Sequence, residues 1–420
     1  MRVALVVSGG VPNPTASGGA LTAWTVLNHL LERGHDVSVV ALRDPEHFEP
    51  TGTPEAERVK VVRGLGTEVV EVISSSTDYF RGLERGPVDK VRRAWRPLDE
   101  ELQPHLVDAP AVRAAVEETG ADVAFVYHWE ALSATTALRL PRFGAVGDPP
   151  QLSHWYRFRE ELPDPRALRR VVRLQSQLRL QPGLLVRLLN ECGAAGAFAA
   201  HHAAWLRKHG ARNLRYLHTP VPDVAGADWR AQRDAGLAER PTVLLVGHLK
   251  GVVTLEGLER FAKDVLPRLE AEGFEVRIAG GYDPPPELAR AFDRPCVTLL
   301  GHVEGAEDEF RRAHALLVPN AIPLGIRVRI VTGWSLGTCV VSHTANENGI
   351  PELEHGANAL LADDGPGLAE QILRAVRDED LRRRVEGGGR ATYERAFAPA
   401  VAAGEIADVL ESLVPARAAA

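Results

Sequence analysis

The stretch Leu316–Leu361, LLVPNAIPLGIRVRIVTGWSLGTCVVSHTANENGIPELEHGANALL, carries the pattern that decides the fold. It opens with an apolar run typical of a buried strand, passes through a loop, and then predicts a helix that carries Arg327 and Arg329. A second apolar run at 339–342 predicts another strand, and a turn bounded by Gly and Pro predicts a second helix near Ile350. Two successive strand-to-helix turns place backbone N–H groups and two guanidinium groups at the carboxyl edge of a sheet, which suits a diphosphate.

The residues before this stretch also predict strands and helices in alternation. Apolar runs predict strands, and the segments between them, about 255–272 and the residues leading to His314, predict helices. The runs lie at 242–246, 275–279, 296–300 and 315–318. This regular alternation predicts a Rossmann-like parallel sheet in the second half of the chain.

The first half also begins with a strand–helix–strand unit. An apolar run at 3–7 predicts a strand rather than a signal peptide, because it is short and ends in glycines. A long loop, SGGVPNPTASGG, leads into a predicted helix at 20–33 with Gly34 as its C-cap, followed by the strand HDVSVVAL. A loop of this length with paired glycines at each end is unlike the short GxGxxG turn, so an NAD-type site is not indicated.

The rest of the first half predicts further strands and one long helix. The predicted strands lie at 59–62, 68–72, 121–127, 143–146, 195–199 and 214–217. The segment 157–191 predicts a basic amphipathic helix, which fits a solvated helix packed by one face and also fits peripheral membrane contact. The arginines of 81–96 fit either surface decoration or an acceptor-recognition patch.

Composition limits the kind of protein. A chain of 420 residues predicts two domains, and a net charge of −7 argues against a nucleic-acid partner. The cysteines, Cys192, Cys296 and Cys339, are far apart, which predicts free thiols in a reducing cytoplasm and no metal site built on them. No apolar run reaches the roughly 18 residues of a spanning helix.

Four segments of the second half carry a resemblance to a known family. VLLVGHL, VRIAGG, VTLLGHV and NENGIPE follow one another in order over residues 242–361, and this succession resembles family 4 (group 1) retaining glycosyltransferases of the GT-B fold. The resemblance implies an α/β protein of two Rossmann-like, doubly wound parallel-sheet domains that face each other across a cleft. It implies an acceptor domain at 1–222, a nucleotide-sugar donor domain at 240–395, and a C-terminal helix at 396–420 that crosses back to the first domain.

The resemblance also assigns roles in the first domain. His128, at the end of the strand 121–127, takes the place of the family histidine that hydrogen-bonds the transferred sugar. Gly18 and Gly19 match a family Gly-Gly pair that approaches the donor phosphate or the acceptor. The family often has His-Asp after the next strand, where this chain has Gly147 and Asp148. The resemblance therefore proposes an acceptor site at Asp148, with His154 and Arg157.

In the second domain the family places its basic residues near the diphosphate of the donor. Arg329, with Arg327 beside it, takes that place, and guanidinium groups bind phosphate oxygens bidentately. After the first strand of this domain the family uses a further basic residue, for which His248 and Lys250 are both candidates. The donor-binding residues implied in addition are Gly247, Thr332, Asn346, Glu347, Gly349, Ile350 and Glu352, the last as ligand of a sugar hydroxyl.

The sequence departs from the family at two acidic positions. Family members carry two glutamates in an E-x7-E pattern, whose positions here hold Leu324 and Thr332. A threonine hydroxyl in place of the ribose-binding carboxylate weakens that contact by about 1 kcal/mol or more. A catalytically degenerate homologue therefore stays open as an alternative, as does a nucleotide-sugar epimerase, which would need carboxylates for proton transfer.

Taken together, the sequence predicts a cytoplasmic, metal-independent glycosyltransferase of the hexosyltransferase class. It would move a sugar from a nucleoside-diphosphate sugar, used as co-substrate, to a hydroxyl of a small-molecule or lipid-linked acceptor. No cofactor is expected, because the arginines can neutralise the diphosphate and no DxD-like motif is suitably placed. The donor base, the sugar, the acceptor and the oligomeric state are not identified by the sequence.

Overall fold

A computed structural model describes residues 1–15, 17–43, 54–73, 109–136, 138–149, 155, 168–247, 249 and 251–414. The chain divides into two compact units. Unit 1 comprises Met1–Pro14, Gly19–Leu217 and Gly404–Ala420, and unit 2 comprises Thr15–Gly18 and His218–Ala403. The basic stretch 81–96 lies outside the described residues.

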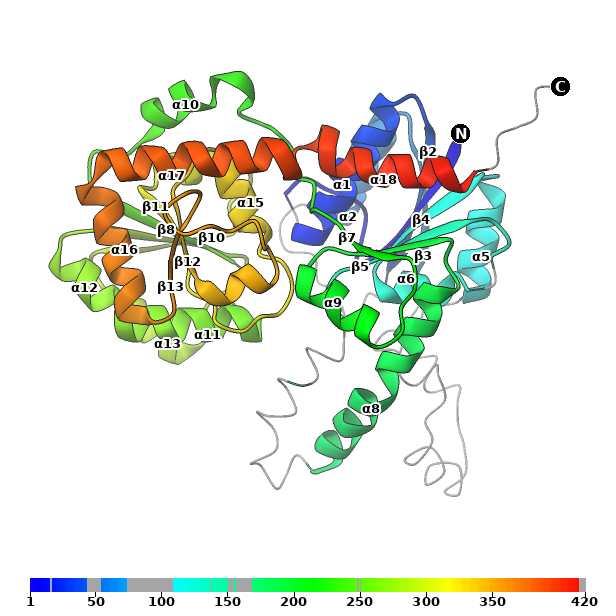
Figure 1. The fold of residues 1–420 in the computed structure, drawn as a ribbon, viewed down its shortest axis with the longest axis horizontal. Helices are drawn as coiled ribbons and strands as arrows, with labels where there is room; N and C mark the ends of the chain where they lie inside the picture. Colours follow the sequence, from blue (N-terminus) through cyan, green and yellow to red (C-terminus); the bar gives the residue numbers. More distant parts are fainter. Residues whose placement is uncertain are drawn as a thin grey trace. The chain divides into compact units, whose positions relative to one another are not determined.

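Unit 1 is built on a seven-stranded parallel sheet of order β3-β2-β1-β4-β5-β6-β7 (Figure 1). Its strands are β1 (Arg2–Ser8), β2 (Asp36–Arg43), β3 (Glu68–Ile73), β4 (Val123–Tyr127), β5 (Arg142–Val146), β6 (Ala194–Ala197) and β7 (Leu214–Tyr216). Its helices are α1 (Gly18–Glu32), α2 (Glu55–Gly64), α5 (Ala109–Glu118), α6 (Trp129–Ala134), α8 (Leu168–Asn190) and α9 (Ala200–Lys208). The two central strands, β1 and β4, are continuous apolar runs because both of their faces are covered.

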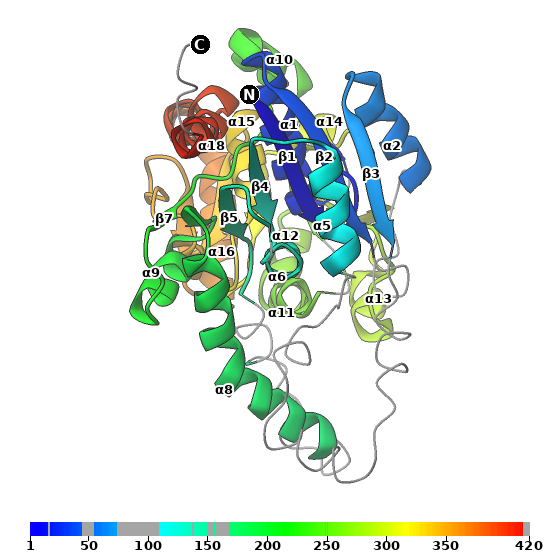
Figure 2. The ribbon, with the colours of Figure 1, turned by 90° about the vertical axis from the view of Figure 1, so that its right-hand side faces the viewer.

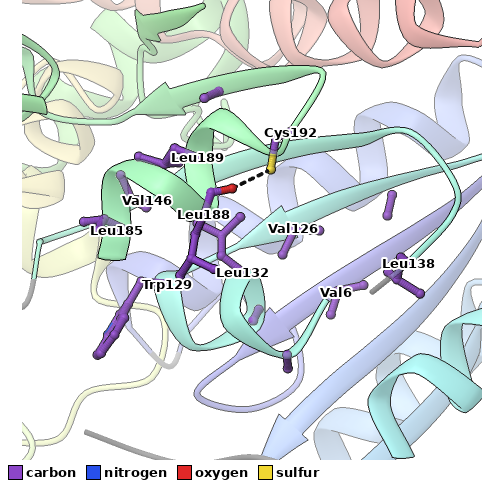
Figure 3. Close-up of a cluster of buried hydrophobic side chains, with 14 of the residues drawn as sticks. Val6, Val126, Trp129, Leu132, Leu138, Val146, Leu185, Leu188, Leu189 and Cys192 are labelled. Carbon is purple, nitrogen blue, oxygen red and sulfur yellow. Dashed lines mark hydrogen bonds between the residues drawn. The ribbon is translucent and has the colours of Figure 1, made fainter. Parts of the chain in front are cut away.

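Helices cover both faces of this sheet. Figure 2 shows α5 in front of the strands and α1 behind them. Leu132 of α6 and Leu185 of α8 belong to the same buried cluster as Val6 and Val126 of the central strands (Figure 3). Leu206 of α9 also belongs to this cluster. Cys192 closes that cluster as a buried thiol that donates to the carbonyl oxygen of Leu188 at 3.5 Å. The core thus fixes the strand ends from which the candidate site residues of unit 1 project.

Unit 2 is built on a six-stranded parallel sheet of order β10-β9-β8-β11-β12-β13. Its strands are β8 (Thr242–Val246), β9 (Glu275–Ala279), β10 (Val297–Gly301), β11 (Ala315–Val318), β12 (Val340–His343) and β13 (Leu360–Ala362). Its helices are η3 (Gly226–Asp228), α10 (Trp229–Gly236), α11 (Val252–Arg260), η4 (Phe261–Val265), α12 (Leu266–Ala271), α13 (Pro286–Phe292), α14 (Glu307–Arg312), α15 (Val328–Ser335), η5 (Thr344–Asn348), α16 (Gly365–Arg377), α17 (Glu379–Thr392) and η6 (Tyr393–Phe397). Its buried core includes Phe261, Ile278 and Leu317.

The last helix, α18 (Pro399–Leu413), begins in unit 2, and its residues from Gly404 onward belong to unit 1. Within unit 1, Arg33 pairs with Asp408 at 2.6 Å, and His35 contacts Glu411 at 2.9 Å. Among the described helices, none combines the length and the apolar character needed to cross a membrane.

Three predictions of local structure are wrong. The sequence predicts a strand at 59–62, but these residues belong to the helix α2, whose buried Arg58, Val59 and Val62 follow helical spacing. Arg327 lies outside the predicted helix, as the residue that precedes α15. No helix begins near Ile350, because the turn after β12 forms the 3-10 helix η5 instead and the next α-helix, α16, begins at Gly365.

Candidate functional site

The strand order of unit 2 reverses between β8 and β11, and such a switch point is where an open α/β sheet binds its ligand. A pocket lies at this point. Its polar lining comes from Gly247, Thr254, Asn320 and Arg329, and the remaining wall is apolar, with Ile278 as one of its members. Its enclosed volume is about 10 Å³, room for about one water molecule, so the pocket marks a point where polar groups converge and is not itself a ligand-sized cavity.

Arg329 supplies the positive charge of this pocket. It lies in the first turn of α15, and its Nη2 donates to Oδ1 of Asn320. Its Nε has no hydrogen-bond acceptor among the residues that the structure describes. Burial, and then the charge of Arg327, lower the pKa of Arg329 to about 9. An anion bound beside this buried guanidinium would stabilise its charged form. The same anion would interact favourably with the positive end of the α15 dipole.

Asn320 orients Arg329 and was not among the predicted site residues. It is buried two residues after the end of β11, and its side-chain Nδ2 donates to the carbonyl oxygen of Val253 at 2.5 Å. Its own carbonyl oxygen accepts from Nδ2 of Asn346 at 3.3 Å. A polar residue two positions after a buried strand of the switch point was the available signal for it.

Arg327, which precedes α15, and Thr332, within it, are both hydrogen-bonded inside the protein. Arg327 donates from Nη2 to the carbonyl oxygen of Ile322 at 2.9 Å. The Thr332 hydroxyl donates to the carbonyl oxygen of Val328, one turn earlier, at 3.2 Å. Leu324, at the first E-x7-E position, is buried.

Two glycines let the backbone at the pocket come close together. A Cβ on Gly247 would lie 3.0 Å from Nη1 of Arg329. A Cβ on Gly280, after β9, would lie 2.3 Å from the carbonyl oxygen of Gly247. Real Cβ atoms do not approach backbone oxygen as closely as 2.3 Å, so Gly280 has to be glycine for the pocket to keep its shape, whereas the neighbour of Gly247 is the end of an arginine side chain.

The turn after β12 packs onto the loop before α15. Asn346 is buried, and its Nδ2 also donates to Ser342 Oγ at 3.0 Å and to the carbonyl oxygen of His343 at 3.1 Å. A Cβ on Gly349 would lie 2.6 Å from the carbonyl oxygen of Gly325. Of the predicted residues in this turn, Glu347 is exposed and Ile350 is fully buried. The amide of Asn346 therefore holds this edge of the sheet together.

Glu352, predicted as the ligand of a sugar hydroxyl, contacts a residue distant in sequence. Its Oε1 lies 2.9 Å from Nε2 of His218. Both side chains are partly buried. This pair could not be predicted from the sequence, because its members lie 134 positions apart.

In unit 1, His128 stands at the end of β4 in a strained conformation. Its φ is 75° and its ψ is 154°, a region that side chains other than glycine rarely adopt. A Cβ on Gly19 would lie 3.0 Å from its Nε2, and a Cβ on Gly147 would lie 3.2 Å from its Cε1. The ring stacks on Tyr127 at 3.9 Å between centroids. Burial lowers the pKa of His128 to about 4, so the imidazole is neutral near pH 7.

Sequence reasoning also missed a polar pair beside His128. The strand order of unit 1 reverses between β1 and β4, and Ser8 ends β1 while Glu130 follows β4. The Ser8 hydroxyl donates to Oε2 of Glu130 at 3.0 Å. Burial raises the pKa of the Glu130 carboxyl. A carboxyl and a neutral imidazole thus lie at the switch point of unit 1.

The structure describes only some of the remaining predicted residues. Gly18 is the first residue of α1. Asp148 is exposed after β5, and its Oδ1 lies 3.9 Å from Nδ1 of His202. His248, Lys250, His154 and Arg157 lie outside the described residues.

Residues 240–378 match the family model of glycosyl transferases group 1, which covers about a third of the chain and includes the whole pocket of unit 2. No curated protein sequence matches the chain. Among solved structures, HepE from Anabaena in complex with UDP and glucose is 15% identical with a TM-score of 0.66, covering 98% of this chain and 100% of that one. Sucrose-phosphate synthase from Thermosynechococcus elongatus is 14% identical with a TM-score of 0.68, covering 98% of each chain.

The fold is GT-B. This confirms the predicted fold class of two Rossmann-like parallel-sheet domains. A third GT-B match, a Listeria monocytogenes protein assigned as a UDP-N-acetylglucosamine 2-epimerase, is 11% identical with a TM-score of 0.55, covering 98% of this chain and 96% of that one. At these identities the likeness shows the fold alone, so activity has to be argued from the site.

Proposed function

We propose that this GT-B protein is a glycosyltransferase that moves a sugar from a nucleoside-diphosphate sugar to a hydroxyl acceptor with retention of configuration. The observation that carries the proposal is Arg329, a partly buried guanidinium aimed into the pocket at the switch point of unit 2. The match of residues 240–378 to group 1 glycosyl transferases supports it. Retention rests on the resemblance to family 4.

In the proposed reaction the nucleoside diphosphate binds unit 2. Negative charge builds on the diphosphate as the bond to the sugar breaks, and groups fixed beforehand around that charge stabilise the transition state most. Arg329 is fixed by Asn320, and the N-terminal end of α15 adds its dipole. Arg327, whose charge already acts on Arg329, contributes from a longer distance.

We propose that His128 of unit 1 hydrogen-bonds the transferred sugar. Because its imidazole is neutral near pH 7, it can donate one hydrogen bond and accept another without adding charge. The strained backbone that holds it is the kind of local strain that functional sites retain. In the same proposal the acceptor binds unit 1 near Asp148.

We further propose that no metal ion is required, because Arg329 supplies positive charge where the diphosphate would lie. Thr332 can offer the ribose only a hydroxyl that is already bonded to Val328, which weakens this contact relative to a carboxylate. A reducing cytoplasm is the proposed location, where the three buried thiols stay reduced.

A thermal-shift panel tests the proposal without an acceptor. UDP, GDP, ADP, dTDP and CDP are added one at a time, with and without magnesium, because a ligand that binds only the folded state must raise the melting temperature. HepE, which shares the fold, was solved with UDP-glucose, so UDP is the first candidate. One nucleotide that stabilises strongly without magnesium supports the transferase and identifies its donor base.

The same panel separates the transferase from a degenerate homologue, which would respond to none of the five nucleotides. An epimerase is favoured by one observation, the Glu130 carboxyl with its raised pKa at the switch point of unit 1. Proton NMR of UDP-N-acetylglucosamine incubated with the protein alone decides this alternative. A new sugar nucleotide in the absence of any acceptor would establish the epimerase and overturn the transferase.

A further inference from the structure

The contact between His218 and Glu352 is shielded from solvent more than a surface ion pair would be. Nε2 of His218 lies 2.9 Å from Oε1 of Glu352, and the exposed fractions of the two side chains are 27% and 18%. Exposed pairs of this kind contribute little, whereas partly buried ones fix side-chain orientation because water no longer competes for the groups. The pair therefore holds the Glu352 carboxylate in one direction.

The main chain on the Glu352 side is anchored independently of this pair. Nδ2 of Asn358 donates to the carbonyl oxygen of Glu352 at 2.7 Å, and Oδ1 of Asn358 accepts from the backbone N–H of Glu354 at 2.8 Å. Asn358 is itself buried and donates to Oγ1 of Thr392, while its carbonyl oxygen accepts from the indole of Trp334 at 2.8 Å. Loss of His218 should thus change the orientation of the carboxylate without releasing the turn.

The histidine side is anchored as well. The His218 ring meets the ring of Phe397 edge-on, at 5.1 Å between centroids and an interplanar angle of 90°. Three residues further on, the N–H of Val221 donates to the carbonyl oxygen of Phe397 at 3.2 Å, and the Tyr393 hydroxyl donates to the carbonyl oxygen of Val221 at 2.9 Å. The imidazole is therefore presented to Glu352 from a fixed segment.

The turn that carries Glu352 is continuous with the pocket of Arg329. Asn320 links the two, because it accepts from Arg329 through its side chain and from Asn346 through its main chain. Gly349, three residues before Glu352, lies against Gly325 in the loop before α15. A donor whose diphosphate binds Arg329 would extend its sugar over residues of the same sheet edge.

We propose that His218 is the positioning residue for Glu352, and that it directs this carboxylate to a hydroxyl of the donor's sugar. The inference rests on the proposed function and names the residues that contact the sugar of the same donor. A carboxylate has about four acceptor positions, so a bond to His218 leaves capacity for a hydroxyl. The ligand class is the hexosyl part of a nucleoside-diphosphate hexose.

The test measures how much the sugar adds to binding. Calorimetry on the full chain compares UDP with UDP-glucose, GDP with GDP-mannose and ADP with ADP-glucose, and the pair that the wild type binds most tightly is kept. The variants are His218→Phe, Glu352→Gln, the double variant, and His218→Gln, which keeps a hydrogen-bond donor. Melting temperatures show whether each variant is folded.

We expect His218→Phe and Glu352→Gln each to lower affinity for the sugar nucleotide about tenfold, as for a lost hydrogen bond to a charged group. Affinity for the nucleoside diphosphate without the sugar should stay within about twofold of the wild type. The double variant should bind the sugar nucleotide as well as either single variant does, since the two residues act as a unit. His218→Gln should recover most of the loss.

If the variants bound the sugar nucleotide and the nucleoside diphosphate equally more weakly, or if neither affinity changed, the inference would be overturned. The contact between His218 and Glu352 would then be structural only. A wild type that binds the diphosphate but gains nothing from the sugar would overturn it too, with the proposed function intact. A wild type that binds no nucleotide would instead remove the proposed function on which the inference depends.

Discussion

At the scale of single residues, His128 combines an expected position with an unexpected backbone. A histidine at the carboxyl end of a central strand could be predicted from the sequence, since an apolar run ends directly before it. Its φ of 75° could not, because that angle depends on the hydrogen bond from its N–H to Ala145 and on the space left by Gly19 and Gly147. Such a conformation costs of order 1–3 kcal/mol, which the surrounding structure must offset.

This strain predicts an order of stability among variants. His128→Gly should be more stable than His128→Ala by about 1–2 kcal/mol, because glycine adopts this backbone without strain while both lose the imidazole. Urea unfolding of the two variants at neutral pH measures the difference. Equal stabilities, or a more stable alanine variant, would show that the backbone relaxes and that no strain is stored there.

The roles of Asn320 and His218 could not be predicted from the sequence. Arg329 could be predicted, because arginine near a strand-to-helix turn has a direct electrostatic reason to bind phosphate. Asn320, which orients it, offers no charge and no motif, and its role depends on three chain segments that meet only in the fold. The same holds for His218, whose partner lies in a distant turn.

At the scale of elements, the parallel strands were predictable and one helix was not. Residues 59–62 are rich in valine, which favours strands, yet they form α2. Pro54 directly precedes that helix, with Glu55 and Glu57 in its first turn, and both features favour a helix start. Burial of one face at helical spacing overrode the strand preference.

The ends of β8 and β9 give a prediction at the element scale. Gly280→Ala should destabilise the protein by about 1–3 kcal/mol and weaken nucleotide binding, because its Cβ would push the backbone of Gly247 away. Gly64→Ala is the matched control, since nothing lies within 4 Å of a Cβ there. Thermal unfolding and nucleotide titration of both variants check this. A Gly280→Ala protein as stable and as well able to bind as the control would refute the close approach.

At the scale of the whole molecule, one arginine adds to the contacts that hold the segment after the unit boundary at His218. Arg390 of α17 is buried, and its two terminal nitrogens donate to Oδ1 and Oδ2 of Asp223 at 2.9 and 2.6 Å. Its Nη1 also donates to the carbonyl oxygen of Ser335 in α15. Burial alone would raise the pKa of Asp223, but the Arg390 guanidinium outweighs it and holds that pKa below its usual range.

This pair predicts a pH-dependent loss of stability. Because the folded pKa lies below the unfolded value of about 3.9, the contribution is complete above about pH 5 and is lost as the pH falls toward the folded pKa. Asp223→Asn should lower stability by roughly 1–2 kcal/mol at pH 7, and this deficit should shrink below about pH 4. Thermal unfolding across this range measures it, with the exposed Asp228→Asn as control. A deficit that does not depend on pH would contradict the pairing.

The proposed function requires Arg329 to bind the diphosphate of a donor at the switch point of unit 2. Isothermal titration calorimetry of UDP, or of the nucleotide selected by the thermal-shift panel, on Arg329→Ala tests it most directly. Arg312→Ala, which removes a half-exposed arginine from the same unit, is the matched control for charge. We predict affinity about tenfold to a hundredfold lower for Arg329→Ala, the size of a lost charge-assisted hydrogen bond, and no change for Arg312→Ala. Equal affinity of the wild type and Arg329→Ala would contradict the placement of the diphosphate.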